Sequence, residues 1–338
     1  MRRKSFRISK AGSLNNIKLV EEKLPEPEEN EVTIEVKAIG LNFADLFAIQ
    51  GLYSATPKGS YIPGLEYSGI IVKKGKDVKD FEIGSKVMGA IRFGAYTTHL
   101  NIDHHYVIQL PDDWSFEEGA AFIVQSLTAY YSLVELGNIK QEYTVLIHSA
   151  AGGVGIYANR IAKTFNAFTI GTIGSESKRN FLINEGYDEI IFRSSNFSKK
   201  LQHILEDRKL NIVLESIGGK IFEESFNALA PSGRIIIYGG AQFMSHSPRP
   251  EFLKLIPKYL FRPKIDPLSL SNVNKSIMGF NLIYLWDRPD DLRVMAEQIL
   301  KMELKRPYIG KVFSFKNLIE ALKYFQTGRS IGKVVVKT

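Results

Sequence analysis

The fold of this chain is decided by residues 145–155, VLIHSAAGGVG, in which an apolar strand runs into a turn of small residues and a helical pattern follows. Gly152 and Gly155 occupy the second and third glycine positions of a G-x-G-x-x-G pattern, and Ala150 occupies the first. Because the side chains here are small, backbone N–H groups and a helix N-terminus can approach a pyrophosphate. The turn lies between a strand and a helix, so it predicts a dinucleotide site. The predicted pyrophosphate-binding residues are Ala151, Gly152, Gly153, Val154 and Gly155.

The composition is ordinary for a globular enzyme, with 44% hydrophobic and 24% charged residues. The length of 338 residues exceeds the usual size of a single core, which predicts two domains. No apolar run is long enough to span a bilayer, and the basic N-terminus MRRKSFRISK lacks the apolar stretch of a secretory signal. We therefore expect a cytoplasmic enzyme.

The chain contains no cysteine, which excludes disulfides and thiolate metal sites. His104 and His105 are adjacent, and in a strand their side chains would face opposite sides, so we predict no metal site. The formal net charge is +8, but the basic residues are scattered. We interpret them as a solvated surface that partly serves an anionic cofactor, and we expect no nucleic-acid partner.

The sequence pattern changes near residue 116. Short strands separated by glycine and proline precede it, which favours a compact, largely β domain. Afterwards strands and helices alternate, as in a doubly wound α/β fold with a parallel sheet. The predicted strands are 145–147, 168–173, 189–192, 211–214 and 234–238, and the predicted helices are 116–136, 153–165, 178–185, 198–206 and 219–229.

We expect the alternating sheet to be complete by Tyr238, so that the tail returns to the first domain. The predicted domains are a β domain of residues 1–120, completed by residues 270–338, and a dinucleotide-binding domain of residues 121–269 with an insert at about 243–272. Basic and aromatic residues interleave in the insert, where prolines prevent one long helix. The insert is a lid over the substrate or a packing element, a dimer arm, or a membrane-surface contact, and we favour a lid or packing element.

The cofactor choice rests on the residues after the second strand of the dinucleotide fold. An Asp or Glu usually binds the ribose hydroxyls there, about twenty residues past the glycines. Here Ser175 lies twenty positions after Gly155, and Lys178 follows in the next turn. A hydroxyl and a cation would bind a 2′-phosphate that an acid would repel, which favours NADPH over NADH. The alternatives are that Glu176 points at the ribose, that Ser175 caps the next helix and that Lys178 is solvated.

Further motifs, taken in order, resemble the medium-chain dehydrogenase/reductase superfamily and its zinc-free quinone oxidoreductase branch. They are GLNFAD (40–45), GLY (51–53), PGLEYSG (63–69), GAY (94–96), AAGGVG (150–155) and SIGKV (330–334). Residues 274–282, NKSIMGFNL, together with the long insert before them, are similar to the sub-branch of vesicle amine transport protein homologues. The resemblance covers nearly the whole chain.

The resemblance implies a GroES-like β domain beside a Rossmann domain, with the cofactor in the cleft between them, and a homodimer. Zinc alcohol dehydrogenases of the superfamily need thiolate ligands that this chain lacks, and Asn42 falls near the ligand-bearing turn. Without a Lewis acid, we expect hydride transfer to a small molecule that is already electron-poor, such as a quinone or an α,β-unsaturated carbonyl.

Candidate catalytic residues follow from the resemblance. Asn42 either contacts the nicotinamide or the substrate oxygen, or caps the helix that starts at Phe43. Tyr53 either donates a hydrogen bond or proton to the substrate carbonyl, or packs in a turn. Asp45 is expected to orient backbone or a basic neighbour, and Tyr67 is expected to line the substrate cleft.

Further cofactor contacts are implied in the same way. Thr128 resembles the threonine near the nicotinamide ribose, or is a buried helical threonine. Gly240 and Phe280 resemble positions that line the nicotinamide, unless Phe280 is plain core. Phe192 stands where many NADPH-using relatives have a tyrosine near the 2′-phosphate, and Arg193 is expected to compensate. The predicted cofactor-binding residues outside the glycine turn are Thr128, Thr172, Ser175, Lys178, Arg193, Gly240 and Phe280.

The sequence thus predicts a zinc-independent, NADPH-dependent oxidoreductase that reduces quinones or activated double bonds. His148, just before the glycine turn, is assigned a structural role. The rival functions are a cofactor-binding adaptor or membrane-surface protein with little turnover, and a dehydrogenase with another metal.

Overall fold

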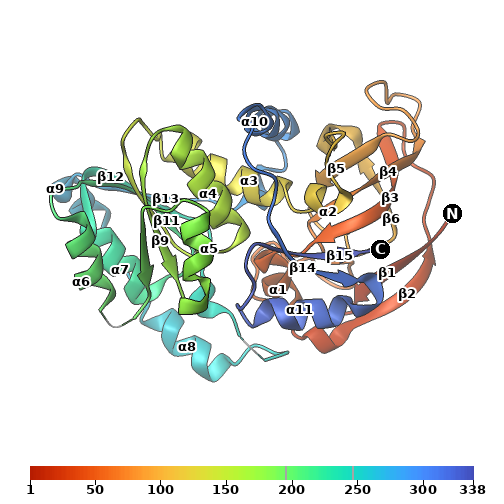
Figure 1. Cartoon of the computed structure of the whole chain (residues 1–338). Coiled ribbons are helices and arrows are strands. Elements are labelled where there is room, and N and C mark those ends of the chain that lie inside the picture. Colours follow the sequence, from red (N-terminus) through yellow and green to blue (C-terminus); the bar gives the residue numbers. More distant parts are fainter. Residues whose placement is uncertain (195, 246) are drawn as a thin grey trace.

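The computed structural model describes residues 1–194, 196–245 and 247–338, and the chain folds into two lobes that lie side by side (Figure 1). The first lobe is built on a seven-stranded sheet in the order β14-β15-β3-β4-β5-β7, with β6 paired to β3, and on a β1-β2 pair. Its strands are β1 (Arg2–Ile8), β2 (Ile17–Lys23), β3 (Glu31–Gly40), β4 (Glu66–Lys74), β5 (Lys86–Ala90), β6 (His99–Asp103), β7 (Val107–Gln109), β14 (Ile309–Ser314) and β15 (Lys333–Lys337). Apolar residues of α1 (Phe43–Ile49) and α11 (Leu318–Gln326) pack into the core of this lobe.

The second lobe is built on a six-stranded, all-parallel sheet in the order β10-β9-β8-β11-β12-β13. Its strands are β8 (Thr144–Ile147), β9 (Phe168–Ile173), β10 (Glu189–Phe192), β11 (Leu210–Glu215), β12 (Leu229–Ile237) and β13 (Ser276–Gly279). Counted from β8, this is the 3-2-1-4-5-6 order of a dinucleotide-binding sheet, whose ligands lie where the order reverses, between β8 and β11. The predicted fold class, a β domain beside a doubly wound sheet, is confirmed.

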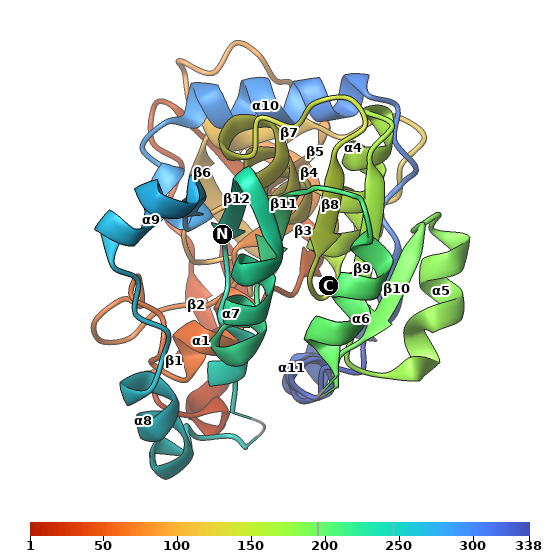
Figure 2. The same ribbon diagram turned by 90° about the vertical axis from the view of Figure 1, so that its left-hand side faces the viewer.

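Helices cover both faces of the parallel sheet (Figure 2). Apolar residues of α6 (Phe197–Leu205) and α7 (Gly219–Ala228) pack on one face. The other face is covered by α3 (Ile123–Tyr130), α4 (Gly153–Thr164) and α5 (Arg179–Asn184), and α10 (Pro289–Lys301) packs on α3. Among the described residues, no helix is both long and apolar enough to cross a membrane.

The single helix predicted over residues 116–136 is wrong. The segment contains α2 (Phe116–Gly119), α3 and a π-helical turn (Tyr131–Leu136). The reason is that α2 packs on β3, β4 and β5 of the first lobe, whereas α3 packs on α4 of the second. The helical pattern is therefore interrupted where the chain crosses between the lobes.

The prediction that the parallel sheet is complete by Tyr238 is also wrong. β13 joins β12 as a sixth parallel strand, with Arg234 opposite Ser276. The chain returns to the first lobe only at β14, later than the predicted boundary at residue 270. The insert before β13 contains two helices, α8 (Phe252–Leu260) and α9 (Pro267–Val273), where the sequence showed no period. Residue 246 of the insert lies outside the described residues.

Candidate cofactor and substrate site

A cavity of about 790 Å³ lies between the lobes and takes lining residues from both. Every predicted site residue except Tyr67 lines it: Asn42, Tyr53, Thr128, Ala151, Gly152, Gly153, Val154, Gly155, Thr172, Ser175, Lys178, Arg193, Gly240 and Phe280. Tyr67 lies instead in the core of the first lobe, fully buried, so the assignment of Tyr67 to the substrate cleft is corrected. Its position on β4, in the middle of the first sheet, explains the burial.

The glycine turn is the best-defined part of the cavity wall. A β-carbon at Gly155 would lie 2.6 Å from the Ala150 backbone, so the helix can start this close to β8 only with glycine there. The N-terminus of α4 has no side-chain cap among the described residues, and its N–H groups are thus free for a ligand. Gly332 donates its N–H to the Ala151 carbonyl at 2.8 Å, which ties the turn to the first lobe.

The residues around the expected 2′-phosphate position differ from the prediction in one respect. The Lys178 ammonium donates to the carbonyl oxygens of Gly328 and Ser330, both at 2.7 Å. Because these carbonyls belong to the first lobe, Lys178 links the two lobes, and the alternative of a solvated Lys178 is wrong. Burial lowers the pKa of Lys178. Glu176 is paired with Arg179 at 2.7 Å and does not line the cavity, which removes it as a ribose ligand.

A second part of the cavity wall contains a buried polar network around Lys333, which was not expected from the sequence. The Lys333 ammonium donates to Asn42 Oδ1 at 2.7 Å and to Glu66 Oε2 at 2.6 Å. The Asn42 amide donates to the Gly40 carbonyl at 3.2 Å and to Glu66 at 3.3 Å. The other Glu66 oxygen accepts from the Val124 N–H at 3.0 Å. Lys333 lines the cavity and stands in the SIGKV motif, which was the available signal.

Asn42 and Asp45 have different roles at the N-terminus of α1. Asn42 occupies the N-cap position, but its side chain is turned to Lys333 and Glu66. Asp45 accepts from the Asn42 N–H at 2.8 Å and from the Tyr96 hydroxyl at 2.9 Å. Burial raises the pKa of Asp45 to about 7. Asp45 thus orients backbone, as predicted, whereas the Asn42 side chain lines the cavity and is held by Lys333, Glu66 and the Gly40 carbonyl.

Tyr53 joins the two lobes beside the cavity. Its hydroxyl donates to Asn281 Oδ1 at 2.6 Å, and Tyr284 of the same loop as Asn281 donates to Ser54 at 2.9 Å. Burial raises the pKa of Tyr53 to about 12. The phenol is therefore a weak acid with its proton already engaged.

The remaining wall of the cavity is mostly apolar. It is formed by Leu41, Phe43, Phe47, Leu65, Ile91, Met244, Phe280, Leu282, Ile283, Trp286 and Phe325. Phe280 packs on Tyr131, with ring centroids 4.9 Å apart. Thr128 lines the wall, yet its hydroxyl donates to the Val124 carbonyl at 2.6 Å within α3. Flat apolar molecules suit such a surface.

Family models match both lobes: the alcohol dehydrogenase GroES-like domain over residues 28–112 and the zinc-binding dehydrogenase over residues 153–290. The chain is 32% identical over 333 residues to the synaptic vesicle membrane protein VAT-1 homolog of Danio rerio, with 97% of this chain and 68% of that protein covered. The chain belongs to the medium-chain dehydrogenase/reductase superfamily. Within it, the chain is a relative of the VAT-1 homologues.

Two solved structures of this superfamily indicate the type of chemistry. The Escherichia coli quinone oxidoreductase complexed with NADPH has a TM-score of 0.85 at 26% identity, with 100% of both chains covered. CurK enoyl reductase has a TM-score of 0.85 at 26% identity, with 99% of both chains covered. The chain is thus an oxidoreductase of the quinone oxidoreductase and enoyl reductase type.

The adjacent histidines do not lie in a strand, which differs from the arrangement assumed for them from the sequence. His104 and His105 form part of a 3-10 turn (His104–Tyr106), and their rings are 4.1 Å apart, on the same side. With Asp103 they make the one group of potential metal ligands found in the described part of the chain. None of the three lines the cavity. The cluster therefore has no part in the site.

The insert is not a lid over the cavity, which corrects that part of the favoured prediction. Of its described residues, Met244 alone lines the cavity. Leu253 of α8 is 91% exposed and Phe261, the residue after α8, is 86% exposed, whereas Leu255 of α8 is buried. Lys258 donates to the Gln242 carbonyl at 2.8 Å and holds α8 beside the segment that leads into the cavity.

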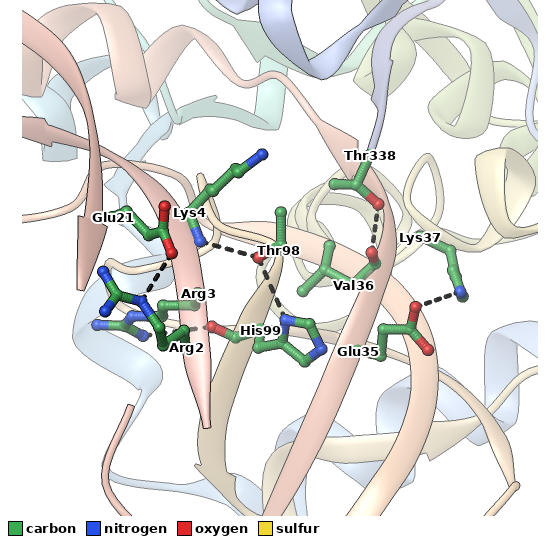
Figure 3. Close-up of a pocket in the computed structure, with 10 residues that line it drawn as sticks. All are labelled: Arg2, Arg3, Lys4, Glu21, Glu35, Val36, Lys37, Thr98, His99 and Thr338. Carbon is green, nitrogen blue, oxygen red and sulfur yellow. Dashed lines mark hydrogen bonds and ion pairs between the residues drawn. The ribbon is translucent and has the colours of Figure 1, made fainter. Parts of the chain in front are cut away.

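A smaller cavity of about 340 Å³ lies on the first lobe, near β1, β6 and the C-terminal residue (Figure 3). Four of its charged side chains are paired with one another: Arg2 with Glu21 at 2.7 Å, and Lys37 with Glu35 at 2.5 Å. None of the predicted site residues lines it. We therefore assign the chemistry to the cavity between the lobes.

Proposed function

We propose that this chain is a zinc-independent, NADPH-dependent oxidoreductase that transfers hydride to a quinone or an α,β-unsaturated carbonyl. The observation that carries the proposal is that one cavity is lined by two kinds of wall: the glycine turn of residues 151–155, called the dinucleotide end here, and the apolar residues with Lys333, called the acceptor end. Backbone N–H groups of residues 153–155 and the Arg193 guanidinium suit an anionic dinucleotide, and the apolar wall suits a flat acceptor. The similarity to an NADPH-complexed quinone oxidoreductase and to an enoyl reductase supports it.

The first end fits NADPH by shape and charge. Gly155 lets the backbone approach a pyrophosphate, and the uncapped N-terminus of α4 supplies the donors. Ser175 and Arg193 would hold the adenosine ribose and its phosphate. When bound, the reduced nicotinamide supplies the hydride.

At the other end the chain stabilises the acceptor. The Lys333 ammonium is fixed by two hydrogen bonds, to Asn42 and Glu66, and its third N–H can meet the negative charge that develops on the acceptor oxygen. Tyr53 would turn its hydroxyl from Asn281 to the same oxygen as a hydrogen-bond donor. A phenol with a pKa of about 12 is a poor acid, so water is the proposed proton source.

The donor set at this end does not suit zinc. Zinc prefers thiolate, imidazole and carboxylate ligands. Here Leu65 and Asn42 line the wall, and the neighbouring carboxylate of Glu66 is already paired with the Lys333 ammonium. A cation added beside Lys333 would be repelled.

The test is oxidation of NADPH by the purified protein against a panel of quinones and enones, with NADH in parallel and the metal content measured on the same sample. The proposal expects turnover with at least one acceptor, preference for NADPH and no stoichiometric zinc. Binding of neither dinucleotide, or turnover that disappears with a chelator, would contradict it.

The exposed insert favours a second candidate function, a membrane-surface protein with little turnover. α8 and the residues after it expose Phe252, Leu253, Ile256, Tyr259, Leu260, Phe261 and Leu268 beside Lys254, Lys258 and Arg262. Apolar residues flanked by cations suit an anionic bilayer surface. Vesicle sedimentation of the wild type and of Leu253→Glu distinguishes the candidates when run with the turnover assay.

A homodimer and a cytoplasmic location stay predictions.

A further inference from the structure

A chain of buried hydrogen bonds runs from the cavity wall to the far side of the parallel sheet. Arg193 Nη1 donates to Thr172 Oγ1 at 3.1 Å, and Thr172 Oγ1 lies 2.9 Å from His148 Nδ1. His148 Nε2 lies 2.9 Å from Ser225 Oγ, which donates to the Ile221 carbonyl at 2.7 Å. His148, Thr172 and Ser225 are all fully buried.

The direction of each hydrogen bond in this series follows from the groups at its two ends, the Ile221 carbonyl and the Arg193 guanidinium. The Ser225 proton goes to a carbonyl, so Ser225 accepts from His148 Nε2–H. His148 Nδ1 then carries no proton and accepts from the Thr172 hydroxyl. The Thr172 oxygen is left to accept from Arg193, which can only donate.

This series of hydrogen bonds from Arg193 to Ser225, called the relay here, requires a neutral His148. Burial, followed by the charge of Arg193, lowers the pKa of His148 to about 3. The imidazole therefore keeps one tautomer over the whole pH range in which the protein is used. A side chain that is fixed in one tautomer orients its neighbours and does not transfer protons.

The Arg193 guanidinium can bind an anion in the cavity, and the buried carboxylate of Glu215 is near enough to interact with its charge. Arg193 lines the cavity, and among the described residues its hydrogen bonds go only to Thr172. A β-carbon at Gly174 would lie 2.8 Å from Arg193 Nη2, so the guanidinium rests on the glycine that follows β9. The adenosine ribose binds after the second strand of such a sheet. Lys178, by contrast, already donates to two carbonyl oxygens.

We propose that Arg193 is the main receptor for the 2′-phosphate of the adenosine ribose, and that His148, acting through Thr172, is a positioning residue that holds the guanidinium there. The inference rests on the proposed use of NADPH. In this proposal His148 has a specific role, and the phosphate is recognised by Arg193 and not by Lys178. The ligand class is a ribose phosphomonoester.

The test is calorimetric titration of the full chain with adenosine 2′,5′-bisphosphate and with adenosine 5′-monophosphate, which differ by the 2′-phosphate alone. Arg193→Met removes the receptor, and Thr172→Val breaks the relay at nearly constant shape. Thr169→Val is the matched control, because Thr169 is a fully buried threonine of the same strand that does not line the cavity. Lys178→Met tests the competing residue.

We expect the wild type to prefer the bisphosphate roughly 10- to 100-fold, the range of a charge-assisted hydrogen bond. Arg193→Met should abolish this preference, Thr172→Val and His148→Gln should reduce it severalfold, and Thr169→Val should leave it unchanged. A merely structural defect would weaken both ligands alike and leave their ratio intact. Preserved preference in Arg193→Met, with loss in Lys178→Met, would overturn the inference and leave the proposed function standing. If the wild type binds neither ligand, the proposed function itself fails.

Discussion

The two ends of the central cavity are built by different means. The dinucleotide end is made of main chain, at the point where a parallel sheet reverses its strand order and α4 begins. The acceptor end is made of side chains that come from α1, α3, α11 and several loops, around the Lys333–Glu66 pair. Main-chain geometry follows from local sequence, whereas side-chain constellations follow from tertiary packing.

The largest effect is expected for Lys333→Met, at the acceptor end. The substitution leaves the carboxylate of Glu66 buried without its partner, which costs about 3–5 kcal/mol of unfolding free energy. Chemical denaturation measures this. The double variant with Glu66→Gln should recover much of the loss, and a double variant no more stable than Lys333→Met would contradict the pairing.

A slightly smaller effect is expected from pH through Asp45. Its folded pKa of about 7 lies above the usual value of 3.8, so the native state binds the proton more tightly. Stability contributed by Asp45 is thus full below about pH 4 and falls as pH rises to about 7, by up to about 4 kcal/mol. The difference in unfolding free energy between wild type and Asp45→Asn should change over this window, and a difference that is flat with pH would be evidence against a buried, uncharged Asp45.

The dinucleotide end should be sensitive to a single methyl group at Gly155. A β-carbon there would meet the Ala150 backbone, which cannot move aside, so Gly155→Ala should cost about 1–3 kcal/mol and weaken NADPH binding at least about tenfold. Gly279→Ala is the control, because a β-carbon there would meet only the Ile237 carbonyl oxygen at 3.7 Å, an ordinary contact, and Gly279 does not line the cavity. Titration calorimetry and thermal unfolding compare the two variants. Equal effects would mean that the turn is not held by the Ala150 contact.

The smallest effect is expected for Tyr53→Phe. The variant loses one hydrogen bond, to Asn281 in the structure and to the acceptor oxygen in the proposal. We expect kcat/KM for the acceptor to fall about 2- to 10-fold, with NADPH affinity unchanged. Steady-state kinetics decide this, and a loss of several orders of magnitude would make Tyr53 the proton source instead.

The same contrast explains what could be predicted from the sequence. Strands 168–173 and 189–192 have the predicted bounds, because apolar runs between turn residues encode buried strands directly. β13 was missed because a four-residue edge strand carries no period of its own and follows an irregular insert. The lid was predicted wrongly because interleaved basic and aromatic residues do not reveal which side of α8 faces solvent.

Among the site residues, the glycine turn was identified from local spacing alone. Lys333 was noticed only as part of a motif, since its partners Asn42 and Glu66 lie 291 and 267 residues away along the chain. Lys178 was placed at the cavity correctly, but its carbonyl partners at residues 328 and 330 come from the first lobe. Contacts between distant segments were thus the part that sequence reasoning could not supply.

The measurement that tests the account most directly is calorimetric titration of NADPH into the wild type and Gly155→Ala. The account predicts one NADPH per chain for the wild type, and binding at least about tenfold weaker for the variant. No heat of binding with the wild type, or the same affinity in both proteins, would contradict a dinucleotide held by the main chain of residues 151–155.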